Sequence, residues 1–184
     1  MNRTSFTGSA GLAAAGATPA GPRAIAHWRL VLGVFKLRIG VLIMVTALGG
    51  MAIVPDGSVS GLQALVLALS VLVASAAAGA FNQYVEADSD RLMARTRGRA
   101  FASGALPRSG AWLVAIAALL VAAVGAAAWV VNGVAAGFVL LGALTYAVVY
   151  TLGLKRRTPW NIVIGGLAGS FAVLAGAAAA NPQI

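Results

Sequence analysis

Five long apolar stretches constrain this chain more than any other feature of its sequence. They cover residues 39–54, 62–85, 111–131, 134–154 and 162–180. Four of them have the roughly 20 residues that a helix needs to cross the hydrocarbon core of a bilayer. The chain has 184 residues, 60% of them hydrophobic and 9% charged, which is more apolar surface than a soluble domain of this size can bury. The sequence therefore predicts an all-α, polytopic transmembrane helix bundle with about five spans.

The first apolar stretch, 39–54, is short for a span. We expect the helix to begin earlier, over residues 31–35, with Lys36 and Arg38 directing their charges toward the lipid headgroups. Strands are excluded because the apolar runs are too long and do not alternate as those of a membrane barrel do.

The basic residues are concentrated before the first span, between the second and third spans, and between the fourth and fifth. They are Arg23, Arg29, Lys36, Arg38, Arg91, Arg95, Arg97, Arg99, Arg108, Lys155, Arg156 and Arg157. The loops at 55–61 and 132–133 have none. By the positive-inside rule, this predicts a multi-pass protein of the cell inner membrane with its N-terminus in the cytoplasm. Because the charges flank spans, we expect a lipid bilayer and no nucleic acid as partner.

Three of the four acidic residues lie close together at the end of the second stretch. If the helix continues there, Asn82, Glu86 and Asp90 occupy positions i, i+4 and i+8 and form one stripe. Asp88 lies off that stripe and approaches it only if the helix ends or unwinds. Stacked carboxylates favour a hard cation such as Mg²⁺, which keeps substrate phosphates in its shell, so a diphosphate is the expected ligand. The alternative is a solvated helix end, paired with Arg91 and Arg95.

The basic residues near this cluster have two interpretations of equal weight. Arg95, Arg99, Lys155 and Arg156 either grip diphosphate oxygens or only anchor the loops by the positive-inside rule. Asn161 opens the last stretch, where it either caps the helix or contacts substrate.

Two motifs give the chain a recognisable pattern. Asn82, Glu86, Asp88, Asp90, Met93, Arg95, Thr96 and Arg99 fit N-x-x-x-E-x-D-x-D-x-x-M-x-R-T-x-x-R, and residues 150–166 fit Y-T-x-x-L-K-R-x-T-x-x-N-I-V-I-G-G. Lys36 and Arg38 match a K-P-R element. With these residues, the chain resembles the UbiA superfamily of intramembrane prenyltransferases, most closely its heme O synthase family, the protoheme IX farnesyltransferases.

The resemblance implies a reaction and a site. It implies transfer of a farnesyl group from farnesyl diphosphate to the vinyl group of heme B, which gives heme O for heme A biosynthesis. It implies catalytic Asn82, Glu86 and Asp90, which together with Asp88 hold Mg²⁺. The implied substrate-binding residues are Lys36, Arg38, Arg95, Arg99, Lys155, Arg156 and Asn161. The expected protein partners are heme A synthase or the terminal oxidase assembly.

Two other functions compete with this one. The first is a related prenyltransferase with an aromatic acceptor such as 4-hydroxybenzoate, and the second is a non-catalytic membrane subunit or fragment. Members of the family have about nine spans and a second aspartate-rich motif between spans six and seven. We therefore expect residues 23–184 to be the N-terminal part of the transmembrane prenyltransferase domain, preceded by a disordered tail at 1–22, and we expect the chain alone to be inactive.

The chain departs from the family pattern at several positions. Leu37 replaces the proline of K-P-R, Ala87 replaces a usual arginine, and Ala100 and Phe101 replace a proline and a leucine. These are mainly backbone-shaping positions, whereas every residue of the expected metal site is present.

Overall fold

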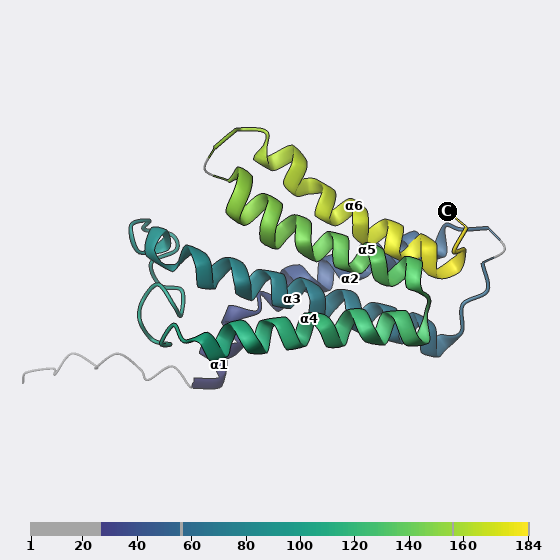
Figure 1. Ribbon diagram of the computed structural model, residues 1–184, viewed down its shortest axis with the longest axis horizontal. Coiled ribbons are helices and arrows are strands. Elements are labelled where there is room, and N and C mark those ends of the chain that lie inside the picture. Colours follow the sequence, from purple (N-terminus) through teal and green to yellow (C-terminus); the bar gives the residue numbers. More distant parts are fainter. Residues whose placement is uncertain (1–26, 56, 156, 184) are drawn as a thin grey trace, which may run out of the picture.

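The computed structural model describes residues 27–55, 57–155 and 157–183, and within those ranges the chain contains helices and loops but no strand. The predicted tail at 1–22 and Arg156 lie outside the described residues. The elements are α1 (His27–Val34), α2 (Leu37–Ala52), α3 (Gly61–Arg91), α4 (Gly110–Val130), α5 (Gly133–Leu144), the π-helix η1 (Thr145–Leu154) and α6 (Asn161–Ala180) (Figure 1). The predicted all-α class is confirmed.

Four of the described helical segments are long and apolar enough to cross a membrane: α3, α4, α5 continued by η1, and α6. Helices α1 and α2 pass the same test only as a pair, and they are bent by 46° where they meet. The chain is therefore a multi-pass membrane protein, with four candidate spans among its described residues, or five if the bent pair is one span. Helix does precede residue 39 over most of 31–35, as expected, but it is a separate helix, α1, because Lys36 interrupts the pair with a left-handed backbone, φ 47° and ψ 42°.

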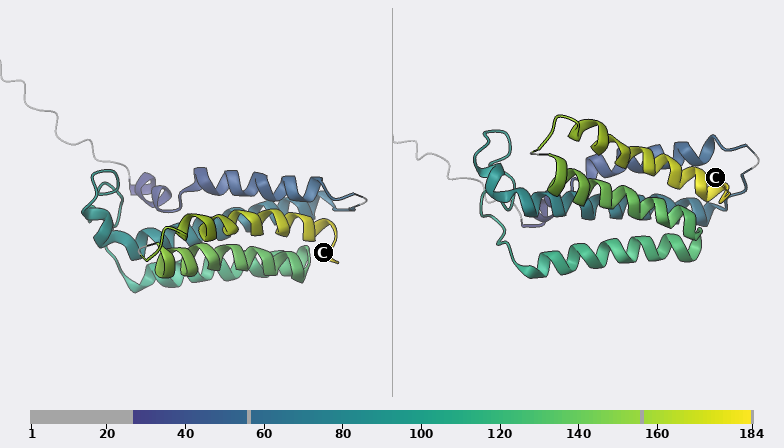
Figure 2. Two further views of the ribbon diagram at one scale, coloured as in Figure 1. Left: turned by 90° about the horizontal axis from the view of Figure 1, so that it is seen from above. Right: turned by 45° about the horizontal axis from the view of Figure 1, so that its top comes forward.

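The helices form a closed ring in which each of α2 to α6 packs against the next and α6 returns to α2 (Figures 1 and 2). Helix α3 is the most buried of the spans. A capping box starts it, in which the Ser60 hydroxyl accepts from the Gln63 backbone N–H and the Ser60 N–H donates to Gln63 Oε1. We call the end that holds α1 and the loops at 92–109 and 155–160 the polar end, and the opposite one the far end.

At the far end, α2 and α6 touch through their backbones. A Cβ atom on Gly176 would overlap the Ala47 carbonyl oxygen, and one on Gly50 would overlap the Val173 carbonyl oxygen. Asn132 ties the turn before α5 to the end of α6, because its Nδ2 donates to the Ala178 carbonyl at 2.9 Å. Such close contact of small residues is how helices associate in lipid, where hydrophobic burial drives nothing.

The fourth span changes its winding part of the way along. After Leu144 the backbone continues as the π-helix η1, in which hydrogen bonds reach five residues back, as from the Lys155 N–H to the Tyr150 carbonyl at 3.0 Å. π-Helical turns are rare and concentrate at functional sites. This one ends at the polar end, beside the acidic residues of α3.

Candidate functional site

The stripe of acidic and amide side chains on α3 is present and faces inward. Helix α3 continues through the acidic cluster to Arg91, as predicted. Asn82, Glu86 and Asp90 are all buried, with exposed fractions of 2%, 4% and 1%. Two carboxylates and an amide therefore lie along one buried face at the polar end.

Each residue of the stripe contacts a cation from another segment. Lys36 Nζ donates to Asn82 Oδ1 at 2.8 Å, and Lys155 Nζ donates to Glu86 Oε2 at 2.6 Å. Arg99 Nη1 donates to Asp90 Oδ2 at 2.7 Å. Three of the predicted substrate-binding residues, from three separate places in the sequence, thus converge on the predicted stripe.

Two hydroxyl groups that were not predicted complete this network. Thr151 Oγ1 accepts from Asn82 Nδ2 at 3.2 Å, and the Tyr146 hydroxyl lies 3.4 Å from Lys36 Nζ. Both residues belong to η1, and Tyr146 stacks on Tyr150 with ring centroids 5.6 Å apart. Thr151 lies inside the second sequence motif, which could have indicated its place in the site. Tyr146 lies in an apolar run that gives no such indication.

Gln83 holds Lys36 in place, and sequence reasoning missed it too. Its Nε2 donates to the Gly33 carbonyl at 2.9 Å and to the Val34 carbonyl at 3.0 Å. Because the helix breaks after α1, these carbonyls lose the N–H donors that a continuous helix would give them. The buried Gln83 amide donates to them instead. The consecutive polar pair Asn82 and Gln83 within an apolar span was the available signal.

Arg99 is positioned by a compact loop. Phe101, 1% exposed, packs edge-on between Tyr84 and Trp112, with centroids 5.6 and 5.2 Å away. Arg91 Nε donates to the Ala102 carbonyl at 2.8 Å. Although Phe101 departs from the family pattern, it anchors the loop that carries Arg99 to Asp90.

Asp88 lies apart from the stripe. Its side chain is 66% exposed, 2.9 Å from Arg108 Nη1 and 3.8 Å from Arg91 Nη1. Helix α3 does not unwind at this position. The alternative of a solvated helix end paired with arginines therefore describes Asp88, but not Glu86 or Asp90.

The remaining predicted residues lie at the margin of the site. Arg38 and Arg95 are exposed, and within the described ranges neither forms an ion pair with a stripe carboxylate. Asn161 is the first residue of α6 rather than its N-cap, and its Nδ2 donates to the Lys155 carbonyl at 3.1 Å. Asn161 thus steadies the backbone that carries Lys155.

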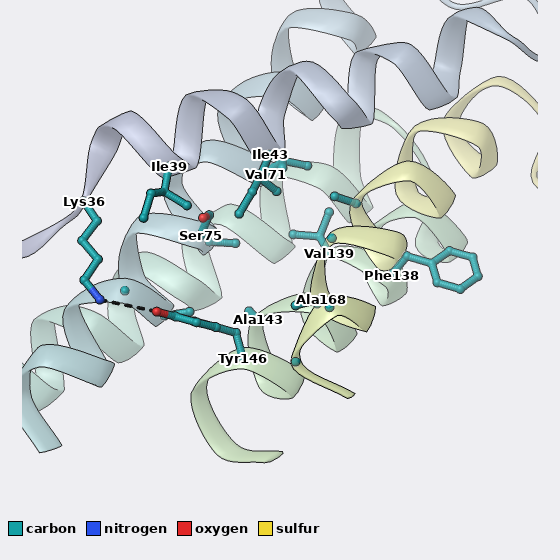
Figure 3. A pocket seen from close by; sticks show the side chains of 18 residues that line it. Lys36, Ile39, Ile43, Val71, Ser75, Phe138, Val139, Ala143, Tyr146 and Ala168 are labelled. Atoms are coloured by element: carbon teal, nitrogen blue, oxygen red, sulfur yellow. Dashed lines mark hydrogen bonds between the residues drawn. The ribbon is translucent and has the colours of Figure 1, made fainter. Parts of the chain in front are cut away.

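An apolar cavity of about 320 Å³ opens beside the stripe, between α2, α3, α5 with η1, and α6. Lys36 and Tyr146 stand at one end of it, and Ile39, Ser75, Ile43, Val71 and Val139 follow along its length (Figure 3). Its volume is within the usual range for small-molecule sites, which is about 300 to 1,000 Å³. A polar mouth over an apolar cavity suits an amphiphile with an anionic head and an apolar tail.

The stripe has the right atoms for a hard cation, although they are now engaged by amines and a guanidinium. Among the described residues, no three His, Cys, Asp or Glu side chains are grouped closely enough to hold a metal ion. Asp90 Oδ1, however, is buried and has no hydrogen-bond partner in the described part of the chain. An orphaned carboxylate oxygen beside further oxygen donors fits the ligand preference of Mg²⁺.

The chain matches proteins of one family. The model of the UbiA prenyltransferase family matches residues 43–184. The chain is 50% identical over 159 residues to "Protoheme IX farnesyltransferase 2" of Paramagnetospirillum magneticum, covering 86% of this chain and 55% of the relative. It is 39% identical over 170 residues to a protoheme IX farnesyltransferase of Rhizorhabdus wittichii, covering 91% and 55%. With a third, of Parasynechococcus marenigrum, it shares 44% over 153 residues, covering 83% and 47%.

The chain thus spans about half the length of the curated relatives it matches. No solved structure matches it.

Proposed function

Because the chain belongs to the UbiA prenyltransferase family, we propose that residues 23–184 form the N-terminal part of an intramembrane prenyltransferase. The proposed enzyme transfers a farnesyl group from farnesyl diphosphate to the vinyl group of heme B and so makes heme O. The names of the relatives support this acceptor over an aromatic one such as 4-hydroxybenzoate. The observation that carries the proposal is the buried Asn82, Glu86 and Asp90 stripe, which Lys36 joins to one end of an apolar cavity through its hydrogen bond to Asn82.

In this proposal, Asn82, Glu86 and Asp90 hold Mg²⁺, and Asp90 Oδ1 is the oxygen already free to do so. Asp88 is left out because it faces solvent. Bound there, Mg²⁺ supplies positive charge that stabilises the diphosphate as it leaves. The side chains of Lys36, Lys155 and Arg99 turn from their present partners to the diphosphate oxygens.

The apolar cavity has the complementary task. It binds the farnesyl tail and excludes water from C1, where positive charge develops as the bond to the diphosphate breaks. The terminal vinyl carbon of heme B then bonds to C1, and the cation left on the neighbouring carbon takes the oxygen of water and releases a proton, which gives the hydroxyethylfarnesyl product and free diphosphate. Heme A synthase or the terminal oxidase assembly is the proposed recipient of heme O.

We further propose that the protein lies in the cell inner membrane with its N-terminus in the cytoplasm, so that the polar end faces the cytoplasm. A reporter fused after Asn132 should then be read outside, and reporters fused after Arg99 or Arg157 should be read in the cytoplasm. A reversed result at any of the three would place the stripe on the wrong side of the membrane.

The activity is tested by expressing the full reading frame that encodes this chain in a strain lacking heme O synthase and extracting the hemes. We expect heme O to appear. The 184-residue chain alone should insert into the membrane but yield none, because one stripe neutralises only part of the charge on the leaving diphosphate. Inserted full-length protein without heme O would overturn the proposed acceptor, and heme O from the short chain would overturn the two-sided site.

A further inference from the structure

The break between α1 and α2 is held by a side chain of α3. In an uninterrupted helix, the carbonyls of Gly33 and Val34 would accept from the backbone N–H groups four residues later. Here both carbonyls accept from Gln83 Nε2, at 2.9 and 3.0 Å. Gln83 is buried, so water does not compete for these bonds. One side chain therefore replaces both of the missing helical donors.

The backbone at the break is strained. In the described part of the chain, Lys36 is the one residue other than glycine with a positive φ. A side chain disfavours this left-handed backbone, and such strain persists only where the surroundings fix it. Gln83 fixes the two carbonyls that precede it, and Val34 is anchored in the core. Without the bonds to Gln83, the 46° bend would be free to straighten, and the side chain of Lys36 would leave its present direction.

Two consecutive amides on α3 hold the two ends of Lys36. Gln83 fixes the backbone from which the side chain starts, and Asn82 Oδ1 accepts from its Nζ at 2.8 Å. Between these ends the stem of Lys36 lies over Gly79, where a Cβ atom would be 3.6 Å from Lys36 Cδ. The ammonium group is thereby placed between the stripe and the end of the cavity that Lys36 lines (Figure 3).

This place matters for the proposed donor, whose charged head would meet the stripe while its tail enters the cavity. The ammonium group lies where the two parts would join, whereas Gln83 is not among the described residues that line the cavity. We propose that Gln83 is a positioning residue of the reaction, which acts on the diphosphate only through the place that it gives Lys36. This inference rests on the proposed function, because it takes the diphosphate to bind beside Lys36.

The first test is a double-mutant cycle in the protein expressed from the full reading frame, in lipid nanodiscs. The measured quantity is the affinity for inorganic diphosphate with Mg²⁺. Lys36→Met should weaken binding at least about tenfold, since it removes a charge-assisted hydrogen bond. Gln83→Met, which loses both N–H donors, should weaken it about fivefold, and the double variant should bind within about twofold of Lys36→Met alone. Once the amine is absent, its position no longer affects binding.

The matched control is Gln63→Met, the same change near the other end of the same helix. It removes the acceptor of the Ser60 N–H in the capping box, so it should lower the melting temperature and leave the affinity for diphosphate unchanged. Gln83→His keeps one N–H donor, and its affinity should lie between those of the unaltered protein and Gln83→Met. If Gln83→Met does not fold, the cycle is completed with Gln83→His.

The second test measures the break itself and does not depend on any ligand. The 184-residue chain has no cysteine, so Trp28→Cys and Ile53→Cys, both at exposed positions on either side of the break, allow two spin labels to be attached. The distance between the labels, measured by electron paramagnetic resonance, should lengthen and broaden with Gln83→Met, because the bend straightens. Gln63→Met should leave the distance unchanged.

The outcomes separate this inference from the proposed function. Additive losses in the cycle, or a label distance that Gln83→Met does not change, would overturn positioning by Gln83 and leave the diphosphate site in place. Normal diphosphate binding by Lys36→Met would also overturn it, because Gln83 would then have no group through which to act. Failure of the unaltered full-length protein to bind diphosphate would overturn both.

Discussion

At the far end of the bundle, α2 and α6 touch through Gly50 and Gly176, whereas toward the polar end the same two helices line a cavity. At the far end the contact between α2 and α6 is made by glycine and alanine, and no ion pair of the described residues lies there. The polar end buries two carboxylates and pairs one oxygen of each with a cation from another segment. Buried ion pairs rarely add net stability, because desolvation offsets their attraction. The comparison indicates that the far end holds the fold and the polar end is organised for chemistry.

The largest expected effect is on activity at the polar end. In the full reading frame, Glu86→Gln or Asp90→Asn should lower heme O formation by at least about 100-fold, since each removes a carboxylate that would hold the Mg²⁺ needed by the leaving diphosphate. The amount of inserted protein, measured by immunoblot, should not change. Asp88→Asn should lose far less, because that carboxylate is exposed. An equal loss would show that Asp88 belongs to the site, and that burial does not separate its role from those of Glu86 and Asp90.

At the far end the largest effect is on stability. Gly176→Ala places a methyl group against the Ala47 carbonyl, and it should lower the free energy of unfolding by about 2–3 kcal/mol. Gly169→Ala on the same helix meets nothing within 4 Å and should be neutral or slightly stabilising, as alanine favours helix. The melting temperatures of both variants in nanodiscs, compared with that of the unaltered chain, test this difference in stability. Equal melting temperatures would show that the backbone contact contributes nothing.

A smaller stability effect is expected at the polar end. Lys155→Met leaves Glu86, which is 4% exposed, without its 2.6 Å partner, and it should cost about 1–3 kcal/mol of unfolding free energy. Adding Glu86→Gln should recover part of this loss, because the uncompensated charge is gone. Chemical unfolding of the two single variants and the double variant gives the coupling energy. Additive losses would mean that the pair does not interact.

The smallest effect is expected on the exposed rim of the polar end. Arg108→Ala removes the partner of Asp88, and both side chains are well exposed, at 38% and 66%. Such pairs contribute at most about 1 kcal/mol, so the melting temperature should change little. A loss as large as that of Lys155→Met would show that exposure does not separate the two kinds of ion pair.

Hydropathy was sufficient to predict most of the fold. The apolar runs at 62–85, 111–131 and 162–180 match α3, α4 and α6 closely, because lipid allows a long apolar segment little except a helix. The register of Asn82, Glu86 and Asp90 followed from helical spacing alone. Both features follow from the local sequence and from the lipid that surrounds it.

The rest depends on contacts between segments. Lys36 breaks the first span without a glycine or proline beside it, since Leu37 stands where the family has proline. The N–H groups that satisfy the carbonyls at this break come from the Gln83 side chain, on another helix. No local pattern predicted η1 or the arrival of Tyr146 beside Lys36. Such features become visible only when the helices are placed together.

The π-helix makes spacing along the chain part of the site. A π-turn holds one more residue than an α-turn between the same two hydrogen-bonded groups. A deletion of one residue between Tyr146 and Lys155 that is not absorbed by returning a π-turn to an α-turn would rotate everything after it by roughly a quarter turn. Lys155 would then turn away from Glu86 without any change in its identity. Insertions and deletions in this span, as well as substitutions, therefore decide whether Lys155 meets Glu86.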